Sequence, residues 1–205
     1  MYKGNKGFIL KFGDLAKTLS LEDWKTTSLE DLDSDTEWVA IVTDDAEAYL
    51  NEINAIVTKM KHPITCFVID LHPCANYKHL QKLWDNYIMT DRESVEVLLR
   101  FIHHHLVNMS SISFTIQDFR KCSVPYPLVK AVSADIVKDA PIAPNAQAVC
   151  YGLCFDIQAC ELGTFYLNAF AKTTDKIDED KYVPWSIQNS SDNVIEAIFF
   201  YERKF

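Results

Sequence analysis

Two apolar runs on either side of an amphipathic segment constrain the fold more than any other feature of this sequence. Residues 37–45, EWVAIVTDD, form a continuous apolar run that ends in acids, and residues 64–71, ITCFVIDL, form a second one. Between them, apolar residues from Ala46 to Met60 recur at helical spacing, and Pro63 ends the pattern. Because short apolar runs of this kind predict buried strands, we expect strand, helix and parallel strand, which is a βαβ unit.

The segments around this unit predict further strands and helices. A short strand is expected at 7–12 and a helix at 76–89. A second helix is expected from Thr90 to about residue 108, and the spacing of Thr90 and Glu93 predicts a capping box at its start. The N-terminal βαβ unit is therefore expected to be followed by two helices.

The chain after residue 110 changes to the two-residue period of strands. Strands are expected at 111–119, 126–139, 147–158, 164–173 and 193–205. The last of them contains the run IFFY, which requires burial on both faces and so predicts a central strand or one at an interface. We expect one α+β domain over residues 1–205, with an N-terminal α/β part at about 1–120 and a C-terminal β-rich part at about 121–205. The C-terminal strands are expected to form a mainly antiparallel meander within one mixed sheet.

The negative charge of the chain is concentrated in one segment. The net charge is −9, and residues 21–47 alone carry ten acidic residues against the single cation Lys25. Because such a surface repels nucleic acid and anionic membrane and attracts basic proteins, we expect a basic protein partner. The alternative is a solvated acidic surface that aids solubility. The candidate partner-binding residues are Glu22, Asp23, Glu30, Asp31, Asp33, Asp35 and Glu37.

The N-terminal segment lacks the long apolar region of a secretory signal. No run approaches the roughly 20 apolar residues of a membrane span, so we expect a cytoplasmic protein. Because disulfides are uncommon in that compartment, the six cysteines are expected to be buried free thiols.

Polar side chains gather where the two central strands are expected to end. Asp44 and Asp45 end the first strand, and Asp70 and His72, on one face, end the second, with Cys74 just beyond. Carboxylates and an imidazole at such an edge suit a divalent cation or acid–base catalysis, and a helix start stabilises a thiolate. The candidate catalytic residues are Asp70, His72 and Cys74, and the candidate metal ligands are Asp44, Asp45 and Asp70. The alternative is that strand ends are polar because they meet solvent, and that Asp44 caps a helix.

The same residues carry a resemblance to a known family. VTDD, the helix after it and FVIDLHP resemble the acidic pair and the aspartate strand of a response-regulator receiver domain. The resemblance covers about 35 residues and implies that Asp70 is a phosphoacceptor. A receiver has a further strand and helix between these elements, so this role is not carried over.

Three consecutive histidines, His103 to His105, lie near the end of the second predicted helix. Neighbouring helical residues point about 100° apart, so consecutive imidazoles do not chelate one metal as an i,i+4 pair does. We interpret them as partly buried side chains at a helix end, where positive charge is favourable. His105, which flanks the apolar stripe, is the best candidate of the three for a ligand or catalytic role.

Motifs of common enzymes are absent from the sequence, which has no Walker A, GxGxxG, GxSxG or HExxH pattern and only five glycines. We therefore lean against an enzyme and expect no cofactor. The inferred function is a small acidic binding or inhibitory protein that resembles immunity proteins in general character and engages a basic partner. One alternative is an enzyme or metal-dependent site that uses Asp44, Asp70, His72 and Cys74. The other is a structural homo-oligomer subunit with the IFFY strand or its edge at the interface.

Overall fold

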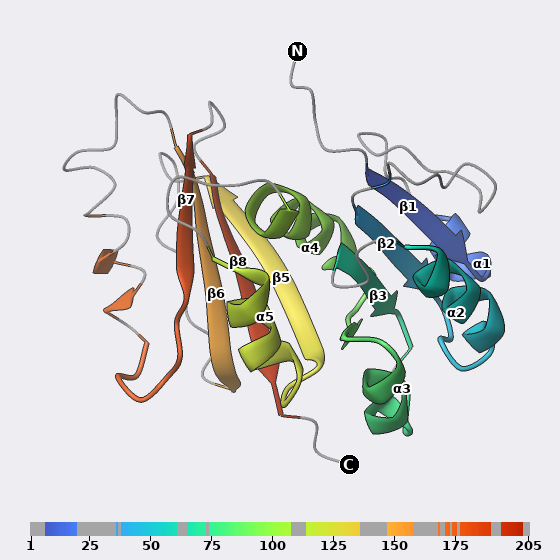
Figure 1. The fold of residues 1–205 in the computed structure, drawn as a ribbon. Helices are drawn as coiled ribbons and strands as arrows, with labels where there is room; N and C mark the ends of the chain where they lie inside the picture. The colour runs from blue at the N-terminus through green and yellow to red at the C-terminus, as the bar shows by residue number, and fades with distance from the viewer. Residues whose placement is uncertain are drawn as a thin grey trace. The chain divides into compact units, whose positions relative to one another are not determined.

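The computed structural model of this chain describes residues 7–19, 36, 38–60, 65–72, 74–107, 114–135, 147–157, 168, 171–172, 174–175, 177–189 and 194–202 (Figure 1). The chain divides into two compact units, Met1–Glu93 (unit 1) and Ser94–Phe205 (unit 2). The single α+β domain expected over residues 1–205 stays a prediction. Within the described residues, no helix is long and apolar enough to cross a membrane.

Unit 1 is built on parallel strands joined by helices. Its strands pair in the order β1-β2-β3-β4, and each neighbouring pair is parallel. The predicted βαβ unit is confirmed as β2, α2 and β3. The elements of unit 1 are β1 (Gly7–Phe12), α1 (Asp14–Lys17), β2 (Trp38–Thr43), α2 (Leu50–Lys59), β3 (Cys66–Asp70), α3 (Tyr77–Leu83) and β4 (Asn86–Met89).

Burial explains why the apolar runs of unit 1 form strands. Every residue of β2 and of β3 is buried, as expected for parallel strands that are covered on both faces. Helix α2 turns Ile53 and Ile56 inward and keeps a polar outer face. It begins at Leu50 and not directly after Asp44, because the residues between them form turns.

The helix predicted at 76–89 is wrong in its second half. Helix α3 ends at Leu83, Trp84 is already extended, and the last four residues of the segment form strand β4. Tyr87 and Ile88 fit a helical period as well as they fit a strand. No glycine or proline marks the boundary in the sequence, so periodicity alone extended the helix too far.

Unit 2 contains antiparallel and parallel pairings. Strand β8 lies between β5 and β6 and is antiparallel to both, whereas β6 and β7 are parallel. The expectation of helices with mixed strand directions is confirmed, but the expected meander is wrong, because the last strand is inserted between two earlier ones. The elements are α4 (Val95–Phe101), the π-helix η3 (Ile102–Val107), α5 (Ile116–Ser123), β5 (Leu128–Asp135), β6 (Ala148–Ile157), β7 (Trp185–Asn189) and β8 (Val194–Tyr201).

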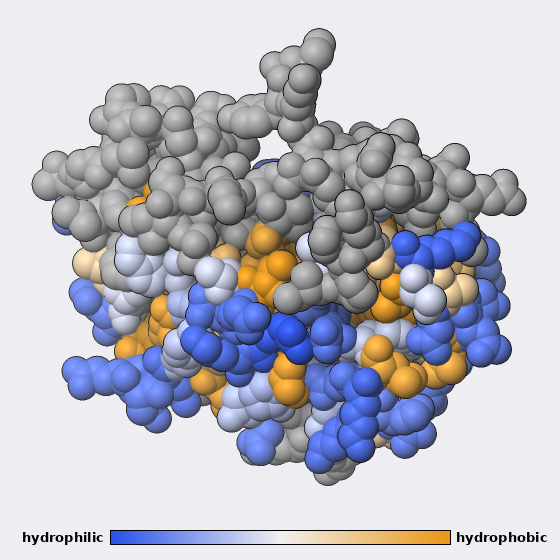
Figure 2. Space-filling model, viewed as in Figure 1, coloured by the Kyte–Doolittle hydropathy of each residue, from blue (hydrophilic) through white to orange (hydrophobic). Residues whose placement is uncertain are grey.

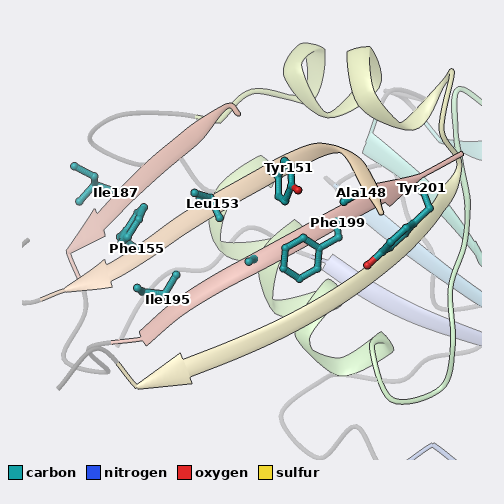
Figure 3. Packing of buried hydrophobic residues seen from close by; sticks show 9 residues of the cluster. Ala148, Tyr151, Leu153, Phe155, Ile187, Ile195, Phe199 and Tyr201 are labelled. Carbon is teal, nitrogen blue, oxygen red and sulfur yellow. The ribbon is translucent and has the colours of Figure 1, made fainter. Parts of the chain in front are cut away.

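The two faces of β8 are both buried, which confirms the central strand predicted from IFFY. On one face, Ile195 and Phe199 pack with Tyr151, Leu153 and Phe155 of β6 (Figure 3). The next residues along the strand point to the opposite face, where the Phe200 ring packs edge-on against Phe119 of α5.

Helix α4 also packs on this second face of β8. Gly152 of β6 makes room there, since a Cβ at this position would lie 2.7 Å from Ile198 and 3.2 Å from Phe101 of α4. The side-chain spacing of the sequence thus places one aromatic layer on each side of β8.

Two helix starts differ from the sequence-based expectation. The segment 111–119 was predicted as a strand, but residues 116–123 form α5. The capping box lies there: Thr115 accepts from the Asp118 amide at 3.1 Å, and Asp118 accepts from the Thr115 amide at 3.2 Å. The box predicted at Thr90 is wrong, since α4 begins after Ser94.

The cysteines are not all free thiols. Cys66, Cys74 and Cys154 are buried and form no disulfide, as expected. Cys122 of α5 and Cys150 of β6 form a disulfide between Cα atoms 6.0 Å apart, so the expectation is wrong for this pair. Cys160 and most of the strand predicted at 164–173 lie outside the described residues.

Candidate functional site

The carboxyl ends of the strands of unit 1 lie at one level. Phe12 pairs with Thr43, Thr43 with Asp70, and Asp70 with Met89, so the residues that follow each strand share one edge. Ligands of open α/β sheets bind at such an edge. The structure therefore brings the predicted strand-end residues to the region where a site was expected.

Asp44, directly after β2, caps helix α1, which follows β1. Its two carboxylate oxygens accept hydrogen bonds from the backbone amides of Leu15 at 2.7 Å and Ala16 at 2.6 Å. Helix α1 has no side-chain cap of its own at Gly13. The negative charge at the helix start is favourable both as a hydrogen-bond acceptor and toward the helix dipole. The alternative expected from the sequence, a capping Asp44, thus applies to α1 and not to α2.

Asp70 is the buried carboxylate of the site, with 1% of its surface exposed. One oxygen accepts from the Tyr87 hydroxyl at 2.8 Å and from the Ala46 amide at 3.3 Å, and the other from the His72 amide at 3.0 Å. Burial raises the pKa of Asp70, although these hydrogen bonds oppose the shift. Asp70 ties the connections after β2 and β3 to Tyr87 of strand β4, and its burial leaves no access for a phosphate donor of the kind that the receiver resemblance implied.

Asp45 lies beside Asp44, but its side chain bonds to residues that follow it closely in the chain. Its exposed carboxylate accepts from the amides of Glu47 at 3.0 Å and Ala48 at 3.1 Å, which forms the turn that leads into α2. Its own amide donates to the Thr43 hydroxyl at 3.2 Å. Asp45 thus shapes the β2–α2 connection.

His72 and Cys74 do not form a reactive pair. The His72 side chain is exposed, and its described contact is the backbone amide that donates to Asp70. Burial raises the pKa of the Cys74 thiol, and the nearby charges of Glu47 and Asp70 raise it further. The thiolate expected at a helix start is therefore disfavoured.

The aspartates at this edge position loops. In the described part of the chain, no three His, Cys, Asp or Glu side chains are placed to hold a metal ion. The three aspartates each accept hydrogen bonds from backbone amides, which take part of the acceptor capacity that a cation would use. Asp44, Asp45 and Asp70 therefore order the connections after β1, β2 and β3.

The remaining predicted site residues are only partly described. The partner-binding acids Glu22, Asp23, Glu30, Asp31, Asp33, Asp35 and Glu37 lie outside the described residues, as does the side chain of His105. His103 lies in η3, where burial, and next the neighbouring His104, lower its pKa to about 4. A neutral His103 does not gain from the helix dipole in the way that the sequence-based interpretation required.

Unit 2 contains a polar cluster that the sequence did not reveal. The Tyr182 hydroxyl donates to Asp118 of α5 at 2.7 Å and accepts from Lys121 at 3.3 Å. Burial alone would raise the pKa of Asp118, but hydrogen bonds from Thr115, Tyr182 and Lys121 lower it to about 2. The Thr115–Asp118 spacing is a capping signal visible in the sequence, whereas nothing there indicates that Tyr182, 64 residues from Asp118, lies beside them.

A second pair in unit 2 links α4 to β8. Arg100 donates from Nε to Glu196 at 2.8 Å, and the Glu196 side chain is 3% exposed. Arg100 also contacts Glu96 one helical turn away at 3.2 Å. A buried acid in the middle of an apolar strand indicates that a cationic side chain lies nearby, but the sequence does not show which residue that is.

Known proteins resemble this chain in structure and not in sequence. No family model and no curated sequence matches it. CetZ from Methanosaeta thermophila is 9% identical and covers 82% of this chain and 63% of its own, with a TM-score of 0.50. The FtsZ dimer of M. jannaschii is 10% identical over 82% of this chain and 64% of its own, with a TM-score of 0.47. TubZ from Bacillus thuringiensis serovar israelensis, in GDP-form protofilaments, is 15% identical over 88% of this chain and 63% of its own, with a TM-score of 0.46.

The likeness to CetZ shows the fold. This chain spans less than two thirds of the length of the CetZ and FtsZ chains. The expected immunity-protein-like inhibitor is wrong, because the fold that the chain shares is that of CetZ. The expected basic protein partner has no support in these likenesses.

Proposed function

We propose that this chain is a self-associating subunit, which corresponds to the homo-oligomer alternative considered from the sequence. The observation that carries the proposal is the fold shared with CetZ over 82% of this chain at a TM-score of 0.50. CetZ2 from Haloferax volcanii is described as a GTPγS-bound protofilament, and that assembly belongs to CetZ2. Its transfer to this chain is an analogy of fold, which is why a direct test of assembly is required.

The candidate site supports association better than catalysis. Asp44, Asp45 and Asp70 each accept hydrogen bonds from backbone amides of unit 1. Cys74 is buried, with a raised pKa that disfavours the thiolate. These residues order loops, and ordered loops at a sheet edge form a rigid surface to which another subunit can bind.

The interface of such a subunit cannot be the edge of β8. That strand is paired with β5 on one side and with β6 on the other, so it has no edge to offer. The sequence-based expectation that the IFFY strand lies at an interface is therefore wrong. Figure 2 shows apolar residues in small separate groups among hydrophilic ones on the face in view. Among the described residues in this view, the apolar groups do not join into one large patch.

Two exposed leucines of unit 1 lie at opposite edges of its parallel strands, which is the arrangement that a head-to-tail contact between copies requires. Leu15 is 40% exposed and follows β1 at the carboxyl edge of the strands, beside the amide contacts of Asp44. Leu83, also 40% exposed, ends α3 just before β4 begins, which places it at the amino edge. A contact that joins opposite edges of successive copies is heterologous, and it builds open filaments unless the ring closes.

Light scattering and electron microscopy test the proposal together. The wild-type chain should scatter increasingly as its concentration rises from about 1 to about 100 µM, and filaments or defined oligomers should be visible in the scattering fraction. Leu15→Glu and Leu83→Glu should each raise the concentration needed. Val132→Glu, on β5 and 39% exposed, is the matched control and should change it less.

Two results would count against the proposal at different levels. A wild-type chain that stays monomeric over the whole range contradicts self-association. A wild-type chain that assembles while Leu15→Glu and Leu83→Glu assemble equally well contradicts the head-to-tail geometry and leaves association itself standing.

A further inference from the structure

We propose that the Cys122–Cys150 disulfide of unit 2 is a redox-sensitive site that a dithiol reduces in the folded protein, and that Tyr182 controls access to it. The disulfide joins α5 to β6, and its two cysteines are 1% and 3% exposed. Tyr182, which comes from a later segment of the chain, is 41% exposed. Access to the buried sulfurs therefore depends on the side chains that lie between them and the solvent.

The backbone of Tyr182 runs alongside Cys150. The two residues form an isolated parallel β-bridge, and the Tyr151 amide donates to the Tyr182 carbonyl at 3.1 Å. Because paired residues of neighbouring strands point to the same face, the Tyr182 side chain lies on the face of β6 that carries the disulfide. Tyr182 is thus a direct neighbour of the bond.

The side chain of Tyr182 binds α5, the element that carries the other half of the disulfide. Its hydroxyl donates to Asp118 at 2.7 Å and accepts from Lys121 at 3.3 Å, and Lys121 Nζ lies 5.5 Å from the centre of the ring. Asp118 precedes Cys122 by one helical turn, and Lys121 precedes it directly. Tyr182 therefore connects the same two elements as the disulfide does.

These contacts of Tyr182 break more easily than the sheet does. The Lys121 and Asp118 side chains are 64% and 21% exposed, so water replaces the polar contacts when Tyr182 moves away. Polar contacts at such positions contribute only modestly to stability. Strand β6 is held independently, because its register with β8 involves no residue of the Tyr182 segment. Movement of Tyr182 therefore opens a path to the disulfide while β6 stays paired.

The reaction at this site is a thiol–disulfide exchange. A thiolate of the dithiol attacks one sulfur of the pair, the bond between the two cysteines breaks, and the cysteine that leaves takes a proton from water. The second thiol of the reductant then loses its proton and attacks the mixed disulfide, which releases the other cysteine to be protonated in turn. Two electrons pass from the dithiol to the pair, and the reductant leaves as a disulfide.

Reduction changes how α5 is held. The helix keeps the packing of Phe119 against Phe200 of β8, with ring centroids 5.7 Å apart, but it loses its covalent link to β6. We expect α5 to open more often in the reduced protein, whereas β8, which is paired on both sides, stays closed. The redox state of the pair thus sets the mobility of α5, whether or not the chain self-associates.

The rate of reduction under native conditions tests the proposal, with dithiothreitol as the probe. The reaction is stopped by alkylation, and mass spectrometry counts the modified cysteines. Tyr182→Phe removes the hydroxyl that bonds Asp118 and Lys121, so reduction should become about tenfold faster. The matched control is Tyr151→Phe, the same change at the residue after Cys150, which lies on the other face of β6 and should leave the rate unchanged. Urea unfolding of the oxidised variants separates this effect from general loss of stability.

Hydrogen exchange of the oxidised and reduced wild type provides the second measurement. Reduction should speed exchange of the α5 amides by about tenfold and affect those of β8 much less. If Tyr182→Phe does not fold, Lys121→Gln replaces it, and the lost cation should speed reduction to a smaller but measurable extent.

Three results would overturn the proposal. The first is a wild-type disulfide that dithiothreitol reduces only at urea concentrations that unfold unit 2. The second is a rate of reduction that the variants at Tyr182 and Lys121 leave unchanged. The third is equal exchange of the α5 amides in the oxidised and reduced proteins.

Discussion

Replacing Arg100 should destabilise unit 2 far more than replacing its partner Glu196. The Glu196 side chain is 3% exposed and the Arg100 side chain 32% exposed, with Nε and the carboxylate 2.8 Å apart. Arg100→Met keeps the apolar stem but removes the cation that faces a buried acid, and such a loss costs about 3 to 5 kcal/mol. Glu196→Gln keeps an acceptor of the same shape for a guanidinium that also reaches water and Glu96, so it should cost only about 1 to 2 kcal/mol.

Urea denaturation monitored by far-UV circular dichroism measures these costs, and hydrogen exchange of the β8 amides assigns them to unit 2. Glu96→Gln is the control, because its 56% exposed side chain forms a surface pair with Arg100 and should cost below about 0.5 kcal/mol. The double variant Arg100→Met with Glu196→Leu should recover much of the loss, since an apolar pair replaces a buried ionic one. Equal costs for Arg100→Met and Glu196→Gln would refute the reasoning, as would a cost of less than about 1 kcal/mol for Arg100→Met.

Three further predictions concern single sites. Burial raises the pKa of Asp70 in the folded state. The stability that protonated Asp70 contributes is therefore fully present at pH values below its unfolded-state pKa, near 4, and is lost as the pH rises through its folded-state pKa. The unfolding free energy of wild type relative to Asp70→Asn should therefore fall over that window, by at most about 1.4 kcal/mol per pH unit, and a flat difference in urea titrations would contradict this. Thr115→Ala should remove the capping box of α5 and cost about 1 kcal/mol in thermal or urea unfolding, whereas the exposed neighbour Gln117→Ala should cost much less. Reduction of the Cys122–Cys150 disulfide, which spans 28 residues, should cost about 3 to 4 kcal/mol, and complete alkylation of both cysteines without reductant would show that the bond is absent.

Apolar runs predicted the elements that are buried on both faces. The strands at 38–43, 66–70 and 194–201 were predictable because each needs cover on both sides whatever the rest of the chain does. Strand β4 was not predictable in this way. Its four residues carry a pattern that also fits the last turn of a helix, and its pairing with β3 decides between them.

Long-range contacts account for most of the other differences. The insertion of β8 between β5 and β6 depends on which strand edges meet, and the side-chain pattern of a strand does not record its neighbours. The disulfide joins cysteines of different elements, and their spacing in the sequence indicates no pairing. The order of the strands and the pairing of the cysteines therefore could not be predicted from side-chain periodicity.

The location of the candidate site was predictable, but the roles of its residues were not. Parallel strands and their order predict that Asp44, Asp45 and Asp70 share an edge. Which amides they bond depends on loop geometry: Asp44 reaches Leu15, 29 residues earlier, and Asp70 reaches Ala46, 24 residues earlier. The sequence therefore suggested a metal or catalytic site where the structure shows carboxylates that hold loops.

Sedimentation velocity of the wild-type chain tests the central claim most directly. If the chain self-associates, its weight-average sedimentation coefficient should rise with protein concentration as species heavier than the 23.5 kDa monomer form. A single 23.5 kDa species at every concentration would contradict self-association.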